Sequence, residues 1–361
     1  MNASVRQTPN KILPGVKEQV KAANLLTLPA AQGARIIAVS HLDSAVAAYH
    51  RIDDPDDVEA LHDFRVALRR LRSCIHAYQA YLSDTVSKKS KKRLQGLARV
   101  TNEARDTEVQ IEWLRSQEKK LPPRQRNSWG WLLDRLELRK AQAYAEIRAT
   151  MTGKFSRFEY KLRTELQTYA VSDELDSQSE GVSLAAATAE KIRKFCKKLE
   201  KNQREIESSN DQLAIHVSRI WLKRLRYLLE PLQEEIDDWP SMINPLKDVQ
   251  NILGKLHDTH FIALEIALAV EDSAALHARR LLDIALHDAD PLAMRAEKRR
   301  SEHAGLVTLA RLANLRTNEL FAELGENFLN GGLNALIRRM MLTGQNLTAR
   351  AAQNYKIVIP V

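Results

Sequence analysis

Basic side chains recur at helical spacing in one segment, and this pattern is suited to binding phosphate. His62, Arg65, Arg69, Arg72 and His76 are separated by three, four, three and four positions, so in a helix they lie along one face. Arginine donates paired hydrogen bonds to phosphate oxygens and stays charged at every relevant pH. Because like charges at this spacing repel one another, a bound polyanion would stabilise such a row.

The same row occurs a second time in the chain, which indicates a duplicated unit. LHDFRVALRRLRSCI at 61–75 matches IHVSRIWLKRLRYLL at 215–229. The coinciding basic residues are His62 with His216, Arg65 with Arg219, Arg69 with Lys223, Arg70 with Arg224 and Arg72 with Arg226. Two such helices facing each other would line a groove with cations from both sides, and a chain of phosphates fits that groove better than a single nucleotide.

A second pair of similar segments follows the basic rows. NEARDTE at 102–108 matches GKLHDTH at 254–260, so Asp106 coincides with Asp258 and Arg105 with His257. Each half of the chain therefore carries a basic helix followed by a helix with an aspartate. We expect the two aspartates to orient arginines by ion pairing, and Arg105 and His257 to add contacts to the basic site.

The elements that must position these residues are helices. Glycine and proline are scarce, at 12 and 11 residues, and apolar residues recur at spacings of three and four from about Ala31 to Leu342. This spacing predicts helices at roughly 29–51, 56–82, 88–119, 128–150, 154–170, 183–207, 211–235, 241–271, 273–287 and 292–325. The expected fold class is all-α.

The polar, acidic stretch from Ser172 to Ser183 predicts a connection between two halves. We expect two four-helix bundles related by internal duplication about a pseudo-two-fold axis, with a basic central groove or pore. The predicted segments are an N-terminal extension at 1–28, bundles at 29–180 and 181–345, and a C-terminal tail at 346–361. The last residues, KIVIPV, favour an extended conformation for that tail.

Composition restricts the partners. Lysine and arginine outnumber aspartate and glutamate by 55 to 46, and the net charge of +9 predicts attraction to polyanions without distinguishing RNA, DNA, anionic membrane and polyphosphate. Cys74 and Cys196 are far apart in sequence and offer neither a disulfide framework nor zinc-ligand spacing, so we expect buried thiols in a reducing compartment. Without an apolar leader or a long apolar run, we expect a soluble, cytoplasmic protein that binds no membrane.

The residues also allow two other functions, of which the first is metal-dependent phosphate hydrolysis. The dipeptides His62-Asp63 and His257-Asp258 resemble those of helical metal-dependent phosphohydrolases, but Asp63 coincides with Val217, so the duplication does not preserve the dipeptide. Arginines on the same face would also repel a divalent cation. With no Gly-rich phosphate loop and no nucleophile with its base, we expect no catalysis, no cofactor and no metal.

Nucleic-acid binding is the second alternative, because a basic stripe also attracts DNA and RNA. The stripe lacks interleaved aromatic side chains that would stack on bases, since Phe64 belongs to the apolar face. We therefore expect only weak, salt-sensitive and non-specific binding to nucleic acid.

The doubled motif H-x-x-R-x-x-x-R/K-R-x-R at 62–72 and 216–226, with A-R-D-like elements at 104–106 and 256–258, resembles the CHAD family over residues 29–345. The resemblance implies a basic pore that selectively binds long-chain inorganic polyphosphate, sometimes at granules, and that sulfate or phosphate could also occupy. The chain departs from the pattern at His257, and it lacks the strands of the fused triphosphate-hydrolysing CYTH domains, so their activity is not implied. Lys140 and Arg299 are further candidates for the pore without a matched motif.

Overall fold

The computed structural model describes residues 25–54, 57, 59–151, 153–175, 181–288, 291–298 and 302–358. Within these ranges every regular element is a helix, and the extended contact is a single bridge between Pro29 and Ser183. The all-α prediction is confirmed. No helix in the described ranges is both long and apolar enough to cross a membrane.

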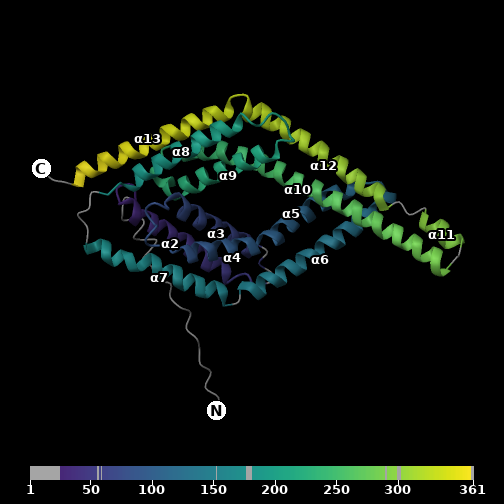
Figure 1. Ribbon diagram of the computed structural model, residues 1–361. Coiled ribbons are helices and arrows are strands. Elements are labelled where there is room, and N and C mark those ends of the chain that lie inside the picture. Colours follow the sequence, from purple (N-terminus) through teal and green to yellow (C-terminus); the bar gives the residue numbers. More distant parts are fainter. Residues whose placement is uncertain are drawn as a thin grey trace, which may run out of the picture.

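The helices follow one another in the order shown in Figure 1. The first part of the chain forms α2 (Ala30–Tyr49), α3 (Ala60–Ala77), α4 (Lys88–Val100), α5 (Asn102–Gln117), a short turn of helix η2 (Pro123–Gln125), α6 (Arg126–Met151) and α7 (Lys154–Leu175). The second part forms α8 (Leu184–Gln203), α9 (Gln212–Leu229), α10 (Trp239–Asp283), α11 (Pro291–Lys298), α12 (Glu302–Leu324) and α13 (Gly332–Val358).

The observed helices differ from the expected ones in four places. The segment 88–119 is divided at Thr101 into α4 and α5, whereas 241–271 and 273–287 are one helix of 45 residues, α10. The segment 292–325 is divided into α11 and α12.

The fourth difference is α13, which was not predicted. The extended conformation expected for the terminal KIVIPV is wrong for its first three residues, because α13 continues to Val358, and residues 359–361 lie outside the described part of the chain. Helix α13 buries Leu336, Met340, Leu347 and Ala351. Apolar residues therefore keep helical spacing through the part of the tail that precedes KIVIPV.

The apolar side chains form two cores. The first joins α2, α3, α4, α7, α8, α9, α13 and the first part of α10, and it includes a cluster of Tyr49, Phe64 and Phe155 rings. The second joins α5, α6, α12 and the middle of α10. Each core takes residues from both sides of the segment 172–183, so a division into two bundles at that segment stays a prediction.

The two sides of that segment meet through backbone and side-chain contacts between α2, α3 and α8. The amide of Ala30 donates to the carbonyl of Val182 and the amide of Leu184 donates to that of Leu28, both at 2.8 Å. The buried hydroxyls of Tyr78 and Thr188 are 2.6 Å apart. In Figure 1, α2, α3, α4 and α7 lie below α8, α9 and α13, while α6, α10 and α12 extend together to the right.

A substitution at Gly305 would test the packing beside the second core. A Cβ atom at Gly305, on α12, would lie 2.5 Å from the carbonyl oxygen of Gln125 and 2.7 Å from Cβ of Ser128. We expect Gly305→Ala to lower the free energy of unfolding by about 1–3 kcal/mol because backbone would have to move. Gly96→Ala in α4 is the control, since nothing lies within 4 Å of its Cβ position, and it should stabilise by about 0.5–1 kcal/mol. Equal melting temperatures for the two variants would contradict this packing.

Candidate functional site

Helices α3 and α9 pack against each other and carry the two basic rows. On α3 the buried residues include Leu61, Phe64, Leu68 and Leu71, and on α9 they include Leu222 and Leu225. Each apolar stripe turns toward the first core. Because the basic row of each helix borders its apolar stripe, the cations are held at the edge of the core rather than in open solvent.

Several of these cations are buried without an acceptor. Only 8% of Arg65 is exposed, and Arg69 and Arg219 are half-buried. Buried nitrogens of these guanidinium groups (Nη1 of Arg65, Nε of Arg69 and Nε of Arg219) have no hydrogen-bond partner among the residues that the structure describes. A buried donor without a partner costs free energy, so folded proteins normally satisfy such groups. An anion between α3 and α9 would supply the missing acceptors.

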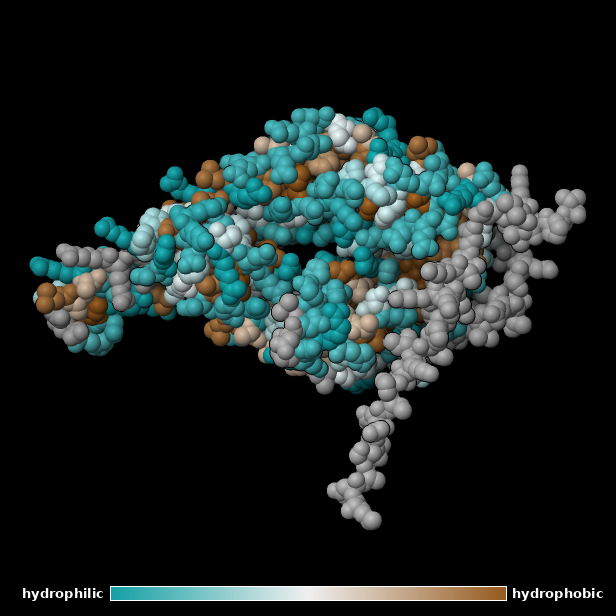
Figure 2. Space-filling model, turned by 180° about the vertical axis from the view of Figure 1, so that it is seen from behind, coloured by the Kyte–Doolittle hydropathy of each residue, from teal (hydrophilic) through white to brown (hydrophobic). Residues whose placement is uncertain are grey.

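The cations of the two helices act on one another electrostatically. Burial, and next the charge of Arg69, lowers the pKa of Arg65 to about 10. Burial lowers the pKa of Lys223 to about 6, with Arg219 on the same helix and Arg69 on α3 as the next causes. The α3 and α9 rows therefore face a common space. Figure 2 shows an opening between the upper and lower helices near the middle of the molecule.

Asp106 on α5 and Asp258 on α10 lie beside this space. Asp106 attracts Arg65 and Asp258 attracts Arg219. Desolvation by the neighbouring helices raises the pKa of both carboxyls, although Asp106 is partly open to solvent, and the two arginines oppose that rise. Among the described residues neither carboxylate forms a direct ion pair with an arginine, so the orienting ion pairs stay a prediction.

Two histidines stack beside the cations. The rings of His216 and His257 are 4.9 Å apart, and His257 meets the edge of Phe261 at 4.7 Å. Burial, and next the charge of Arg219, lowers the pKa of His257 to about 3, and the same two causes lower that of His216. Both rings are therefore uncharged at neutral pH. His62 lies half-buried near the start of α3.

Arg70 and Arg226, which were also predicted for the basic site, contact a carboxylate. Arg70 donates from Nε to Glu230 at 2.8 Å, and Nε of Arg226 lies 3.2 Å from the other oxygen of the same carboxylate. Glu230, at the end of α9, thus bridges the two basic helices and partly neutralises both arginines. Sequence reasoning missed this residue, although its position four residues after Arg226 is the spacing of a helical ion pair.

Arg105 and Lys140 form a smaller group on α5 and α6. Arg105 lies 3.4 Å from Glu108, which also accepts a hydrogen bond from the hydroxyl of Tyr144. The amino group of Lys140 lies 6.0 Å from the ring of Tyr144. Arg299 lies outside the described residues. Arg224 lines a separate basic pocket, which is described below, and the charge of Arg72 acts on Arg224.

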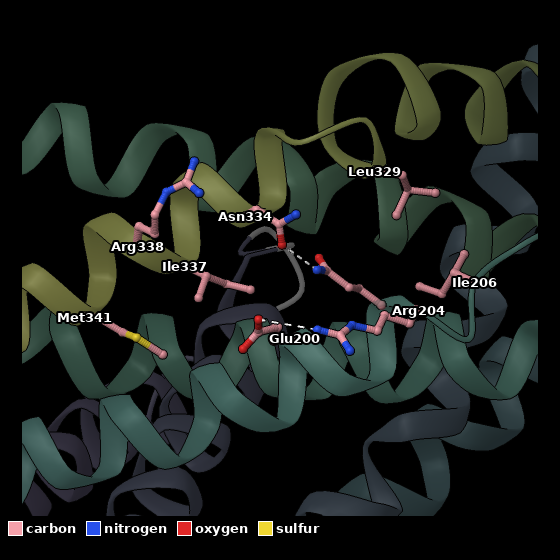
Figure 3. A pocket seen from close by; sticks show the side chains of 9 residues that line it. Glu200, Arg204, Ile206, Leu329, Asn334, Ile337, Arg338 and Met341 are labelled. Carbon is pink, nitrogen blue, oxygen red and sulfur yellow. Dashed lines mark hydrogen bonds and ion pairs between the residues drawn. The ribbon is translucent and has the colours of Figure 1, made fainter.

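A different pocket, of about 600 Å³, lies between α8 and α13 (Figure 3). Arg204 lies 3.6 Å from Glu200, and Gln203 donates to Asn334 at 2.5 Å. Ile337 and Met341 line the same walls. Because the carboxylate of Glu200 lies in its wall beside Arg204, and apolar side chains make up much of the rest, this pocket is less suited to a polyanion than the space between α3 and α9.

Metal and thiol chemistry have little support in this part of the molecule. The described residues contain no group of three or more histidine, cysteine, aspartate or glutamate side chains that could hold a metal ion. Cys74 and Cys196 are buried free thiols, as predicted, and burial raises the pKa of each to about 12. A thiol with so high a pKa is a poor nucleophile at neutral pH.

Comparisons with known proteins agree with this helical arrangement. The family model of the CHAD domain matches residues 37–267. The crystal structure of the CHAD domain from the plant Ricinus communis is similar, with a TM-score of 0.55 and 21% identity, covering 76% of this chain and 94% of that one. PptA from Streptomyces chartreusis has a TM-score of 0.54 and 15% identity, covering 82% of this chain and 100% of that one. These two likenesses show the fold alone.

No curated protein matches the sequence. The family model, however, spans more than half of the chain, and both copies of the basic motif, at 62–72 and 216–226, lie inside the matched residues. The chain belongs to the CHAD domain family.

Proposed function

We propose that this protein binds inorganic polyphosphate in the groove between α3 and α9, and that it is a binding protein rather than an enzyme. The observation that carries the proposal is the set of buried guanidinium donors without acceptors on Arg65, Arg69 and Arg219. The CHAD family is linked to polyphosphate binding in general. Binding of this kind would also bring the chain to polyphosphate granules.

The same groove follows from an internal duplication, which we include in the proposal. Helices α2, α3, α6 and α7 would correspond to α8, α9, α12 and α13, and the pair α4 and α5 to the long helix α10. The pairings support this: α2 packs on α3 as α8 does on α9, α5 on α6 as α10 does on α12, and α2 on α7 as α8 does on α13. The duplicated helices then place like charges on both walls of one groove.

A continuous row of charges favours a linear polyanion over a compact one. From Arg65 to Arg72 the α3 row extends about 10 Å at ~1.5 Å per residue, and Arg219 and Lys223 face it from α9. Successive phosphates of one chain can engage these cations together, whereas a single phosphate reaches few of them. Among the described residues, two cations of the basic rows lie over aromatic rings, Arg224 over Trp221 and Arg226 over Tyr227, so the rows offer few faces on which successive nucleic-acid bases could stack.

The test is a titration of the purified protein with long-chain polyphosphate, duplex DNA and RNA at matched phosphate concentration in near-physiological salt. We expect polyphosphate to bind at least about tenfold more tightly than either nucleic acid, because the groove holds fixed donors for closely spaced phosphates. General attraction by the net charge of +9 predicts comparable affinity for all three polymers. Comparable affinities would replace the groove by that general mechanism.

A further inference from the structure

A second basic pocket, of about 590 Å³, lies between the end of α3, α8 and α9. We call it the outer pocket. Its polar walls carry His76 from α3, Lys191, Lys194 and Lys198 from α8, and Arg224 from α9, while Trp221 provides an aromatic wall. No carboxylate is among its lining residues in the described part of the chain. The outer pocket therefore concentrates positive charge in a concave space.

An aromatic ring, rather than an acidic side chain, holds two of these cations. The amino group of Lys198 and the guanidinium carbon of Arg224 each lie 4.6 Å from the centroid of the Trp221 ring, and Phe195 packs on Trp221 at 5.5 Å. A cation–π contact positions a cation without neutralising it, unlike the carboxylate that holds Arg70. The charges of the outer pocket are thus kept in place and available to an anion.

The row on α3 connects the outer pocket to the groove. Arg65, Arg69, Arg72 and His76 share one face of α3, and the row extends about 16 Å at ~1.5 Å per residue. Arg72 acts electrostatically on both Arg224 and His76, so it lies between the two sites. Arg224, Lys191, Arg72 and Lys198 together lower the pKa of His76 after burial, which places all these charges around one volume.

We propose that the outer pocket is a second subsite for inorganic oligophosphate, and that it continues the path of a polyphosphate chain from the groove across Trp221. This inference rests on the proposed function, because the continuing chain is the one that occupies the groove. A chain long enough to leave the groove at Arg72 meets Lys191, Lys198 and Arg224 next. A short oligophosphate can occupy the outer pocket alone.

The first measurement uses tripolyphosphate and the fluorescence of Trp221, isolated as the difference between the natural protein and Trp221→Phe. We expect tripolyphosphate to change this emission, because it would sit among the cations on the ring. The change should vanish in Lys191→Gln/Lys198→Gln. It should persist in Arg193→Gln/Lys197→Gln, which removes two charges from the same helix outside the pocket lining. An unchanged Trp221 emission in the natural protein would overturn the proposal.

The second measurement separates a continuing chain from an independent anion. We expect Lys191→Gln/Lys198→Gln to bind long-chain polyphosphate about tenfold more weakly than Arg193→Gln/Lys197→Gln does. Equal long-chain affinities for these two variants would overturn the continuous path even if tripolyphosphate still changed Trp221. Arg65→Gln/Arg219→Gln should keep its tripolyphosphate response, so a failure of the groove is distinguished from a failure of the outer pocket.

Discussion

The double variant Arg65→Gln/Arg219→Gln is expected to bind long-chain polyphosphate at least about a hundredfold more weakly than the natural protein. Among the described residues these arginines have buried nitrogens without acceptors, and Arg69 on α3 acts electrostatically on both of them. A hydrogen bond to a charged group contributes about 1.5–3 kcal/mol, and each ~1.4 kcal/mol is tenfold in affinity. Isothermal titration calorimetry in near-physiological salt measures the loss.

The matched control is Lys88→Gln/Lys89→Gln, which removes two charges from the exposed start of α4. We expect at most about a twofold change in its polyphosphate affinity, because exposed charges act through screened attraction. The melting temperature of Arg65→Gln/Arg219→Gln without ligand should not fall, since the variant removes two desolvated cations that Arg69 repels. A loss of binding accompanied by a large fall in melting temperature would assign the two arginines to the fold instead.

The sequence predicts the basic helices well because both relevant signals are local. The spacing of three and four in His62, Arg65, Arg69 and Arg72 defines a helix face without any knowledge of tertiary contacts. Its repetition from His216 to Arg226 indicates that a second helix carries the same face. The structure places these two helices in contact, as the expected groove requires.

Other features depend on contacts between distant segments, and local spacing does not contain them. Glu230 neutralises Arg70 across 160 positions of sequence, so the identity of an arginine alone does not show whether it is available to a ligand. Helical spacing relates Lys191, Lys194 and Lys198, but this spacing alone does not show that they line a pocket. The pocket forms only because α8 packs beside Trp221 on α9. The missed helix α13 likewise depends on packing against α8, since its last residues are β-branched and favour extended chain by themselves.

The buried cations of α3 and α9 are costly to the free protein, so the proposed binding of a polyanion is linked to its stability. Burial and mutual repulsion lower the pKa of Arg65, Arg219 and Lys223, so these groups hold their charge less favourably in the folded state than in the unfolded chain. A polyanion that binds only the folded state removes this penalty and stabilises the protein further by mass action. Lys223 responds most, because its folded pKa of about 6 lies below neutral pH.

Lowering the pH from 8 to 6 is therefore expected to tighten polyphosphate binding, by up to about tenfold per pH unit, and the effect should level off below pH 6. In the free protein Lys223 is uncharged above its pKa of about 6, held there by burial and by Arg219, Arg69 and Arg226 against the attraction of Asp258. Bound phosphate raises that pKa, so binding takes up a proton between pH 6 and the higher bound value.

The control is Lys223→Arg, which carries its charge throughout this range, so its polyphosphate affinity should depend less on pH. The pH dependence that remains in this variant comes from titration of the ligand and of His216 and His257. Equal slopes for the natural protein and Lys223→Arg, measured by calorimetry between pH 6 and 8, would remove Lys223 from the groove's proton uptake.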